Sequence, residues 1–256
     1  MIHPTVIIDP TSKIDENVEI GPYTVIGANV SIGSGTIIGP HVTINGTTKI
    51  GKNNRIYQFS SIGEDPQDKK YAGEKSFLEI GDNNEIREFT TIHRGTSQDN
   101  NITIIGSNNL LMAYTHVAHD CVIADDVILA NAASLGGHVH IGNNVILGGF
   151  SIVHQFCHLG EHCFAAMGSA ITKDVPPFVM VGGRPTKPHG INTVGLDRRG
   201  FSAETILHIK RAYKVLYKSG MKLSEASVKL AELAKEQPEL GVLVKFLEKS
   251  NRSILR

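Results

Sequence analysis

The sequence of 256 residues lacks tryptophan, has few aromatic residues (6%) and shows no excess of either charge, with 25 basic and 25 acidic side chains. A zero net charge gives no general attraction to nucleic acid or to an acidic membrane surface. No apolar run is long enough to span a bilayer, and the N-terminus lacks a basic segment followed by an apolar stretch. We therefore expect a cytoplasmic protein with no nucleic-acid partner and no stable membrane insertion.

Cysteine is scarce, and the three residues present are Cys121, Cys157 and Cys163. Their odd number and the absence of CxxC spacing argue against both a disulfide framework and a zinc ribbon. We expect reduced, mostly structural thiols. A nucleophilic cysteine is the less favoured alternative.

The abundant feature is an aliphatic residue at every sixth position. Eleven isoleucines keep this frame from Ile2 to Ile62, and a second unbroken frame runs from Ile105 to Ile171. A period of six fits neither an α-helix nor a simple strand. It is typical of a parallel β-helix built from hexapeptides, in which three repeats form one triangular coil of about 18 residues. Glycine often follows the aliphatic residue, and we expect it at corners that turn with positive φ.

Two charged or polar segments, 64–78 and 94–104, interrupt the frame, which restarts at Ile105 one residue out of phase. We expect both to be external loops on a β-helix of residues 1–181, which ends near Pro176 and Pro177 because proline removes ladder donors. Residues 182–200, rich in glycine, proline and basic residues, are expected to be a linker. Helical periodicity after Ser202, a typical N-cap, predicts a small all-α domain of three helices over 201–256 that covers one end of the solenoid.

Histidines gather at sequence spacings close to one coil: His116, His119, His138 and His154. Because successive coils stack at roughly 4.8 Å, these side chains should share one edge. Histidine suits a general base near neutral pH, so His119 is a candidate. Asp120 could orient it only if the chain turns a corner there, since strand neighbours point to opposite faces. An N–H of Gly137 on the next coil could face a developing oxyanion.

These features resemble one known family. The matching segments are residues 67–74, Ile92 to Thr96, His116 to Cys121, Gly137 to Val139, Val153 to Cys157, Asp174 to Val179 and Leu196 to Ser202. Together with the repeats they resemble the acyl-ACP:UDP-N-acetylglucosamine O-acyltransferases over essentially the whole chain. The resemblance implies a left-handed parallel β-helix, a homotrimer with active sites between subunits, and transfer of a 3-hydroxyacyl chain from acyl carrier protein to the 3-hydroxyl of UDP-N-acetylglucosamine, the first step of lipid A synthesis.

By this resemblance His119 is the general base, Asp120 supports it, and the Gly137 N–H stabilises the oxyanion. Neither an acyl-enzyme, a metal nor a cofactor is expected, because the phosphopantetheine belongs to the donor. Further substrate contacts are expected from Asp68, Lys70, His93, His116, His138, His154 and Gln155. Nucleotide contacts are expected from Asn192, Arg198 and Arg199, and the arginine fork suits phosphate oxygens.

Two positions depart from the family pattern. Val194 stands where the family often has a glutamate, which puts that nucleotide contact in doubt. Met167 stands where members with long-chain donors have a glycine. Since methionine fills volume that the last methylenes need, we expect a donor chain nearer ten carbons than fourteen.

A basic stripe is predicted on the first C-terminal helix, where Lys210, Lys214 and Lys218 recur every four residues beside Arg211. An acidic carrier protein would be steered toward such a face. The alternative, a merely solvated helix face, remains open.

Three other functions compete. The first is a metal enzyme like the γ-type carbonic anhydrases, which requires at least three ligands within about 2.1 Å of one ion. The second is another hexapeptide transferase, either an acetyltransferase that uses CoA or an N-acyltransferase, whose extra N-terminal domain is not expected because the frame begins at Ile2. The third is a scaffold without turnover.

Overall fold

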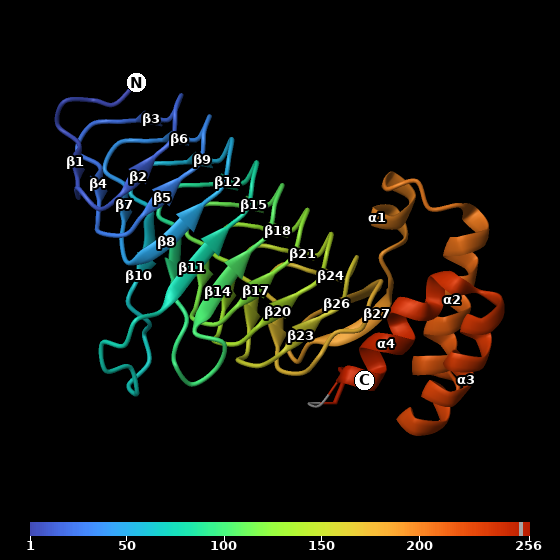
Figure 1. The fold of residues 1–256 in the computed structure, drawn as a ribbon. Coiled ribbons are helices and arrows are strands. Elements are labelled where there is room, and N and C mark those ends of the chain that lie inside the picture. Colours follow the sequence, from blue (N-terminus) through green and yellow to red (C-terminus); the bar gives the residue numbers. More distant parts are fainter. Residues whose placement is uncertain (251–252) are drawn as a thin grey trace.

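The computed structural model describes residues 1–250 and 253–256. Short parallel strands wind into a long triangular prism, and a group of helices lies at its C-terminal end (Figure 1). Successive strands fall in turn on three sheets, named here by their first strands. The chain is thus mainly β, a β-helix of hexapeptides followed by a helical region, as the sequence predicts.

The β1 sheet contains β1 (Ile7–Ile8), β4 (Val25–Ile26), β7 (Thr43–Ile44), β10 (Ser61–Glu64), β13 (Thr91–His93), β16 (His116–Val117), β19 (Ser134–Leu135), β22 (Ile152–Val153) and β25 (Ala170–Ile171). The β2 sheet contains β2 (Lys13–Ile14), β5 (Ser31–Ile32), β8 (Thr47–Ile50), β11 (Phe77–Ile80), β14 (Ile102–Ile105), β17 (Val122–Ile123), β20 (His140–Ile141) and β23 (His158–Leu159). The β3 sheet contains β3 (Glu19–Ile20), β6 (Ile37–Ile38), β9 (Arg55–Ile56), β12 (Glu85–Ile86), β15 (Leu110–Leu111), β18 (Ile128–Leu129), β21 (Ile146–Leu147), β24 (Phe164–Ala165), β26 (Val179–Gly182) and β27 (Lys187–Ile191).

The aliphatic frame forms the interior of the prism. Ile8 pairs with Ile26 and Ile26 with Ile44, so one coil takes 18 residues. From Ile20 to Ile62 the frame isoleucines are at most 2% exposed. Ile2, by contrast, is 45% exposed. The frame therefore continues to the first coil, but its N-terminal end has no coil stacked upon it.

The three corners of the prism differ from the expectation for glycine. The left-handed positions are occupied mainly by asparagine, aspartate, histidine and aromatic residues, such as Asn53 with φ of 55° and His138 with φ of 61°. Glycines after the frame residue serve close stacking instead. A Cβ on Gly142 would lie 2.7 Å from the backbone nitrogen of Glu161 in the next coil. Corners are named here by the sheets that they join: β1–β2, β2–β3 and β3–β1.

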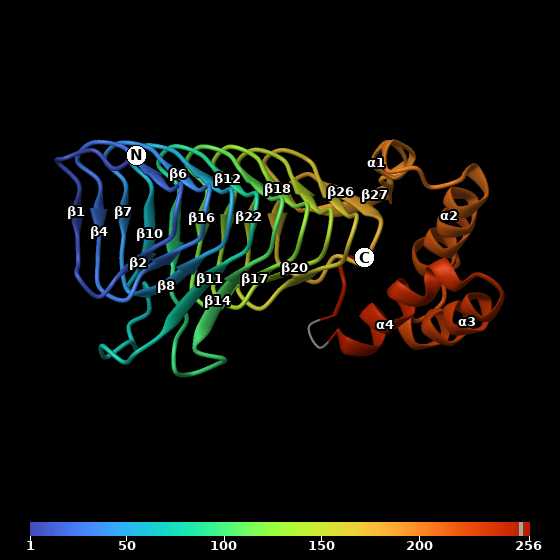
Figure 2. The ribbon, with the colours of Figure 1, turned by 45° about the horizontal axis from the view of Figure 1, so that its top comes forward.

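Two excursions leave the prism, residues 65–76 and 94–101, close to the predicted loops. Both leave at the β1–β2 corner and hang side by side from one edge (Figure 2). The buried Arg94 guanidinium donates to the Gly63 carbonyl and to the Asp65 carboxylate, which anchors the start of the first excursion. The Ser97 hydroxyl donates to Glu74 at 3.0 Å and joins the two excursions.

The segment 182–200, expected to be a linker, is structured. β26 and β27 form an antiparallel hairpin, and α1 (Thr193–Arg198) follows it. The Asn192 side chain caps α1 by accepting the Gly195 N–H at 3.1 Å. The glycine and proline that suggested a linker belong to the hairpin turn, where Gly183 has φ of 88°.

The helical region contains α2 (Ala203–Lys218), α3 (Leu223–Glu236), a short 3-10 turn (Pro238–Leu240) and α4 (Gly241–Lys249). Ser202 is the N-cap of α2 and accepts the Thr205 N–H at 3.0 Å, as predicted. Tyr213 and Leu255 join the hydrophobic core of the prism, so the helical region covers the last coils. None of the helices in the described residues is both long and apolar enough to cross a membrane.

Candidate active site

The predicted catalytic pair lies at the β1–β2 corner directly after β16. Asp120 adopts φ of 58°, so the chain turns where a straight strand would separate neighbouring side chains. His119 Nδ1 and Asp120 Oδ2 are consequently 2.9 Å apart, a hydrogen-bond distance. The corner that this pairing requires is therefore present.

Asp120 is only 3% exposed and its carboxylate is well supplied with donors. It accepts the Thr96 backbone N–H at 2.9 Å and the Thr96 hydroxyl at 2.7 Å. Burial alone would raise the pKa of Asp120, but the hydrogen bonds from His119 and Thr96 outweigh it and lower that pKa. An anionic carboxylate places the proton on His119 Nδ1 and leaves Nε2 as the basic nitrogen.

Gly137 lies one coil further on, with its backbone against the imidazole. A Cβ at this position would be 2.5 Å from His119 Cε1 and 2.7 Å from Nε2. Among the described residues its N–H has no backbone hydrogen-bond partner. A free donor therefore stands beside the candidate base.

His138 completes the corner. Its ring stacks on Phe156 at 4.3 Å between centroids and meets His119 edge-on at 5.0 Å. Its Nδ1 lies 2.7 Å from Asp99 Oδ2 and 3.9 Å from Asp120 Oδ2. His138 is thus held between two carboxylates, one from the corner and one from the second excursion.

A cavity of about 890 Å³ lies between the two excursions and this corner. Its lining residues are Gln67, Asp68, Lys69, Lys70, Gln98, Asp99, His119, His138, His140, Gln155, Phe156 and His158. Five predicted site residues share the cavity: Asp68, Lys70, His119, His138 and Gln155. The first excursion thus carries a carboxylate and an ammonium toward the candidate base.

Three predicted substrate residues lie near this cavity without lining it. His93 and His116 lie on neighbouring strands of the β1 sheet, with perpendicular rings 5.1 Å apart. Burial, followed by the nearby His116, lowers the pKa of His93 to about 4. Burial also lowers the pKa of His116, whose Nδ1 is 2.7 Å from Thr91 Oγ1. His154 is exposed at the start of the β1–β2 corner.

The predicted nucleotide residues lie at another corner. Arg199 Nε donates to Asn144 Oδ1 at 2.6 Å, and the Asn192 amide donates to the His162 carbonyl at 3.1 Å, both at the β2–β3 corner. Arg198 is exposed beside them. Val194 is 62% exposed and offers no polar group. One chain therefore keeps these residues apart from His119.

Met167 occupies the third corner, β3–β1, and its side chain is 77% exposed. It does not line the cavity around His119. The predicted residues are thus divided among three corners of the prism.

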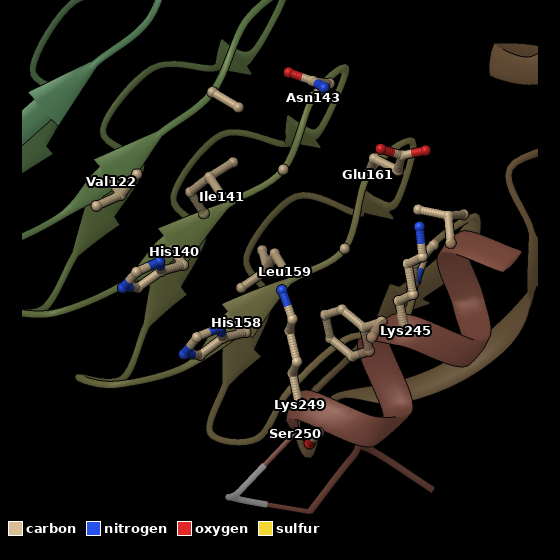
Figure 3. Close-up of a pocket in the computed structure, with 16 residues that line it drawn as sticks. Val122, His140, Ile141, Asn143, His158, Leu159, Glu161, Lys245, Lys249 and Ser250 are labelled. Carbon is tan, nitrogen blue, oxygen red and sulfur yellow. The ribbon is translucent and has the colours of Figure 1, made fainter. Parts of the chain in front are cut away.

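Several cavity residues were not predicted. Asp99 lies in the second excursion, where no repeat gives a spatial address. His140 and His158 stack at 4.5 Å between centroids on the β2 sheet, and their separation of one coil could have revealed them. The same two rings border a second, mostly apolar groove of about 390 Å³ beneath α4, with Lys245 and Lys249 on its rim (Figure 3).

The metal alternative has a geometric basis in one cluster. His119, Asp120 and His138 offer ligand atoms that all lie within 4.8 Å of one another. His116 and His154, the other histidines considered for this alternative, do not join the cluster. The His119–Asp120 contact of 2.9 Å is already a direct hydrogen bond. The donor set therefore suits a hydrogen-bonded pair, and a metal assay distinguishes the two.

The hexapeptide prism and its histidine corner define the class of hexapeptide-repeat transferases, and the bacterial transferase hexapeptide model matches residues 1–34, 11–46 and 102–137. A second family model, UDP-N-acetylglucosamine O-acyltransferase domain 2, matches residues 174–255. The chain belongs to the acyl-[acyl-carrier-protein]–UDP-N-acetylglucosamine O-acyltransferase family. The member from Thiobacillus denitrificans is 53% identical, covering 100% of this chain and 99% of that one.

Solved structures agree over the full length. The Acinetobacter baumannii LpxA structure has a TM-score of 0.97 at 49% identity, covering 100% of this chain and 99% of that one. The UDP-N-acetylglucosamine acyltransferase of Francisella novicida has a TM-score of 0.99 at 46% identity, covering 100% and 94%. The helical region therefore belongs to the shared architecture as much as the prism does.

Proposed function

We propose that this O-acyltransferase moves a 3-hydroxyacyl chain from acyl carrier protein to the 3-hydroxyl of UDP-N-acetylglucosamine, the first step of lipid A synthesis. The observation that carries the proposal is the His119–Asp120 pair beside the free N–H of Gly137, in a cavity that the charged first excursion overhangs. The names of the relatives support the two substrates.

In the proposed mechanism, Nε2 of His119 removes the proton from the sugar hydroxyl as its oxygen attacks the thioester carbon. The carbonyl becomes an oxyanion, to which Gly137 N–H donates a hydrogen bond. Collapse of this intermediate forms the ester and expels the pantetheine thiolate, which takes the proton back from the imidazolium. Asp120 stabilises the imidazolium between the two proton transfers.

Transfer without an acyl-enzyme is supported by what surrounds His119. None of the described residues that line its cavity carries a thiol or a hydroxyl group. Cys121 is the nearest cysteine in sequence, but it is fully buried, and burial raises its pKa to about 12. A thiolate nucleophile is therefore not available at this corner.

We also propose that the working protein is a homotrimer whose copies complete each other's sites. The predicted base, nucleotide residues and Met167 lie on three different corners of one prism. A site that uses all of them forms only where corners of neighbouring copies meet. The isolated chain supplies each part, but not the assembled cleft.

The β3–β1 corner carries the surface expected of such an interface. Stacked rings follow one another along it on successive coils: Tyr23, His41, Phe59, Phe89 and Tyr114. The tyrosines and phenylalanines of this ladder are 42–61% exposed. An exposed apolar row of this length suits contact with a second copy. Met167, on the same corner, would then reach the neighbouring His119 and limit the donor to about ten carbons.

Two features support the remaining expectations. The side chains of Lys210, Lys214 and Lys218 are exposed on α2, where they could attract the acidic carrier protein. The proposed compartment is the cytoplasm, and it suits three free cysteines that are all buried.

The test mixes the purified protein with UDP-N-acetylglucosamine and a series of 3-hydroxyacyl carrier proteins, and follows product by mass. The same assay is run on His119→Ala and on His41→Ala, a control on the aromatic ladder. We expect a sharp optimum near ten carbons that His119→Ala abolishes and His41→Ala leaves in place. No product with any donor would refute the proposal and make metal analysis the next step.

A further inference from the structure

Thr96 binds the catalytic carboxylate more extensively than any other described residue. Its backbone N–H reaches both oxygens of Asp120, at 2.9 and 3.1 Å, and its hydroxyl donates to Oδ2 at 2.7 Å. Oδ2 is also the oxygen that pairs with His119 Nδ1. The hydroxyl and the imidazole therefore share one acceptor atom, so Thr96 acts on the charge that His119 experiences.

The position of Thr96 is rigidly fixed. Thr96 is fully buried, which excludes water as a substitute donor. The preceding Gly95 packs so closely that a Cβ there would lie 2.1 Å from the Ile102 nitrogen. Arg94, one residue earlier, is anchored to the Gly63 carbonyl. The start of the second excursion is thus a built support for Asp120.

We propose that Thr96 is a positioning residue for the acyl transfer, which holds Asp120 in place and tempers its basicity toward His119. The inference rests on the proposed function, because it assumes that His119 is the base. Thr96 touches neither substrate nor the reacting atoms. It acts through Asp120, and this role is separate from the substrate contacts expected of the first excursion.

Removal of the hydroxyl has a defined consequence. With one donor fewer, the Asp120 carboxylate is more basic, binds the His119 imidazolium more strongly and lets it turn toward the vacated side. The base is then protonated at higher pH and is less well aligned. Other titratable groups face the pair from the surrounding elements and stay in place in every variant: His93, His116, His138, Asp99, Asp68, Lys69, Lys70, His140 and His158.

The experiment compares Thr96→Val, which keeps the shape and the backbone N–H, with Thr96→Ser, which keeps the hydroxyl. Thr103→Val is the matched control, because the buried Thr103 hydroxyl accepts the Asp120 backbone N–H at 2.8 Å and does not touch the carboxylate. For each variant kcat, KM for UDP-N-acetylglucosamine, thermal unfolding and the pH profile of kcat/KM are measured.

We expect Thr96→Val to lower kcat about tenfold with little change in KM, and to move the acid limb upward by about half a pH unit. Thr96→Ser should restore both, and Thr103→Val should lower thermal stability without moving the limb. A shared profile for Thr96→Val and Thr103→Val would overturn the proposal, as would a Thr96→Ser protein as impaired as Thr96→Val. An unsubstituted protein without activity would instead refute the proposed function.

Discussion

Replacement of Gly137 by alanine tests the catalytic corner with a single methyl group. The added Cβ would stand 2.5 Å from His119 Cε1, whereas carbon atoms in ordinary contact are about 3.5 Å apart. The imidazole must therefore retreat by about 1 Å. Because the φ of Gly137 is not in the positive region, alanine is acceptable to the backbone itself. The N–H remains, so the perturbation acts on the base.

A displacement of about 1 Å at a reacting group lowers the rate on the order of 100-fold, which corresponds to roughly 2.7 kcal/mol in the activation free energy. We expect this loss in kcat, with KM for UDP-N-acetylglucosamine nearly unchanged. The assay is the steady-state rate with a donor of ten carbons, together with thermal unfolding to show that the variant is folded.

Gly149→Ala is the matched control. It lies on a different corner, and a Cβ there meets only the Asn131 carbonyl oxygen, at 3.3 Å. This variant should keep its activity. If Gly137→Ala were as active as Gly149→Ala, the imidazole would have room that the geometry denies it, and the placement of His119 as the base would be wrong.

Three further predictions use the same assays. Met167→Gly should shift the donor optimum toward fourteen carbons, and an unchanged product series would exclude Met167 as the limit. Arg199→Ala should raise KM for UDP-N-acetylglucosamine about tenfold or more at constant kcat, whereas Lys229→Ala, on the exposed face of α3, should change neither. His93, with its pKa lowered to about 4, should stay neutral while the unfolded chain binds a proton below about pH 6.5, so unfolding free energy should fall on the order of 3 kcal/mol toward pH 4. His93→Gln should flatten that fall in urea titrations, and an equal slope would contradict it.

The prism could be predicted because its information is local and repeated. Each frame residue states the same thing about its own strand, so Ile26 and Ile44 pair as the period of 18 requires. The same arithmetic places His119 and His138 on one edge. The segment 182–200 could not be recognised in this way, since a hairpin and a six-residue helix are too short for any periodicity.

The excursions limited the prediction of the site. Thr96 and Asp99 reach the catalytic corner from a segment with no repeat, and only their contacts with Asp120 and His138 reveal them. The resemblance correctly brought Asp68 and Lys70 to the cavity. It could not show that Asn192 and Arg199 lie on another corner of the same chain, because a sequence does not record which copy supplies a residue.

The excursions also show how this fold can vary its specificity. Ile50 pairs with Ile80 and Ile80 with Ile105, so these coils take 30 and 25 residues where an uninterrupted one takes 18. The surplus of 12 residues preserves the sextet phase in the sequence and the surplus of 7 shifts it by one, yet the isoleucines remain in register in space. Loop length at the β1–β2 corner is therefore independent of core packing. Evolution, or a designer, can rewrite the rim of the catalytic cleft one insertion at a time while the interior stays unaltered.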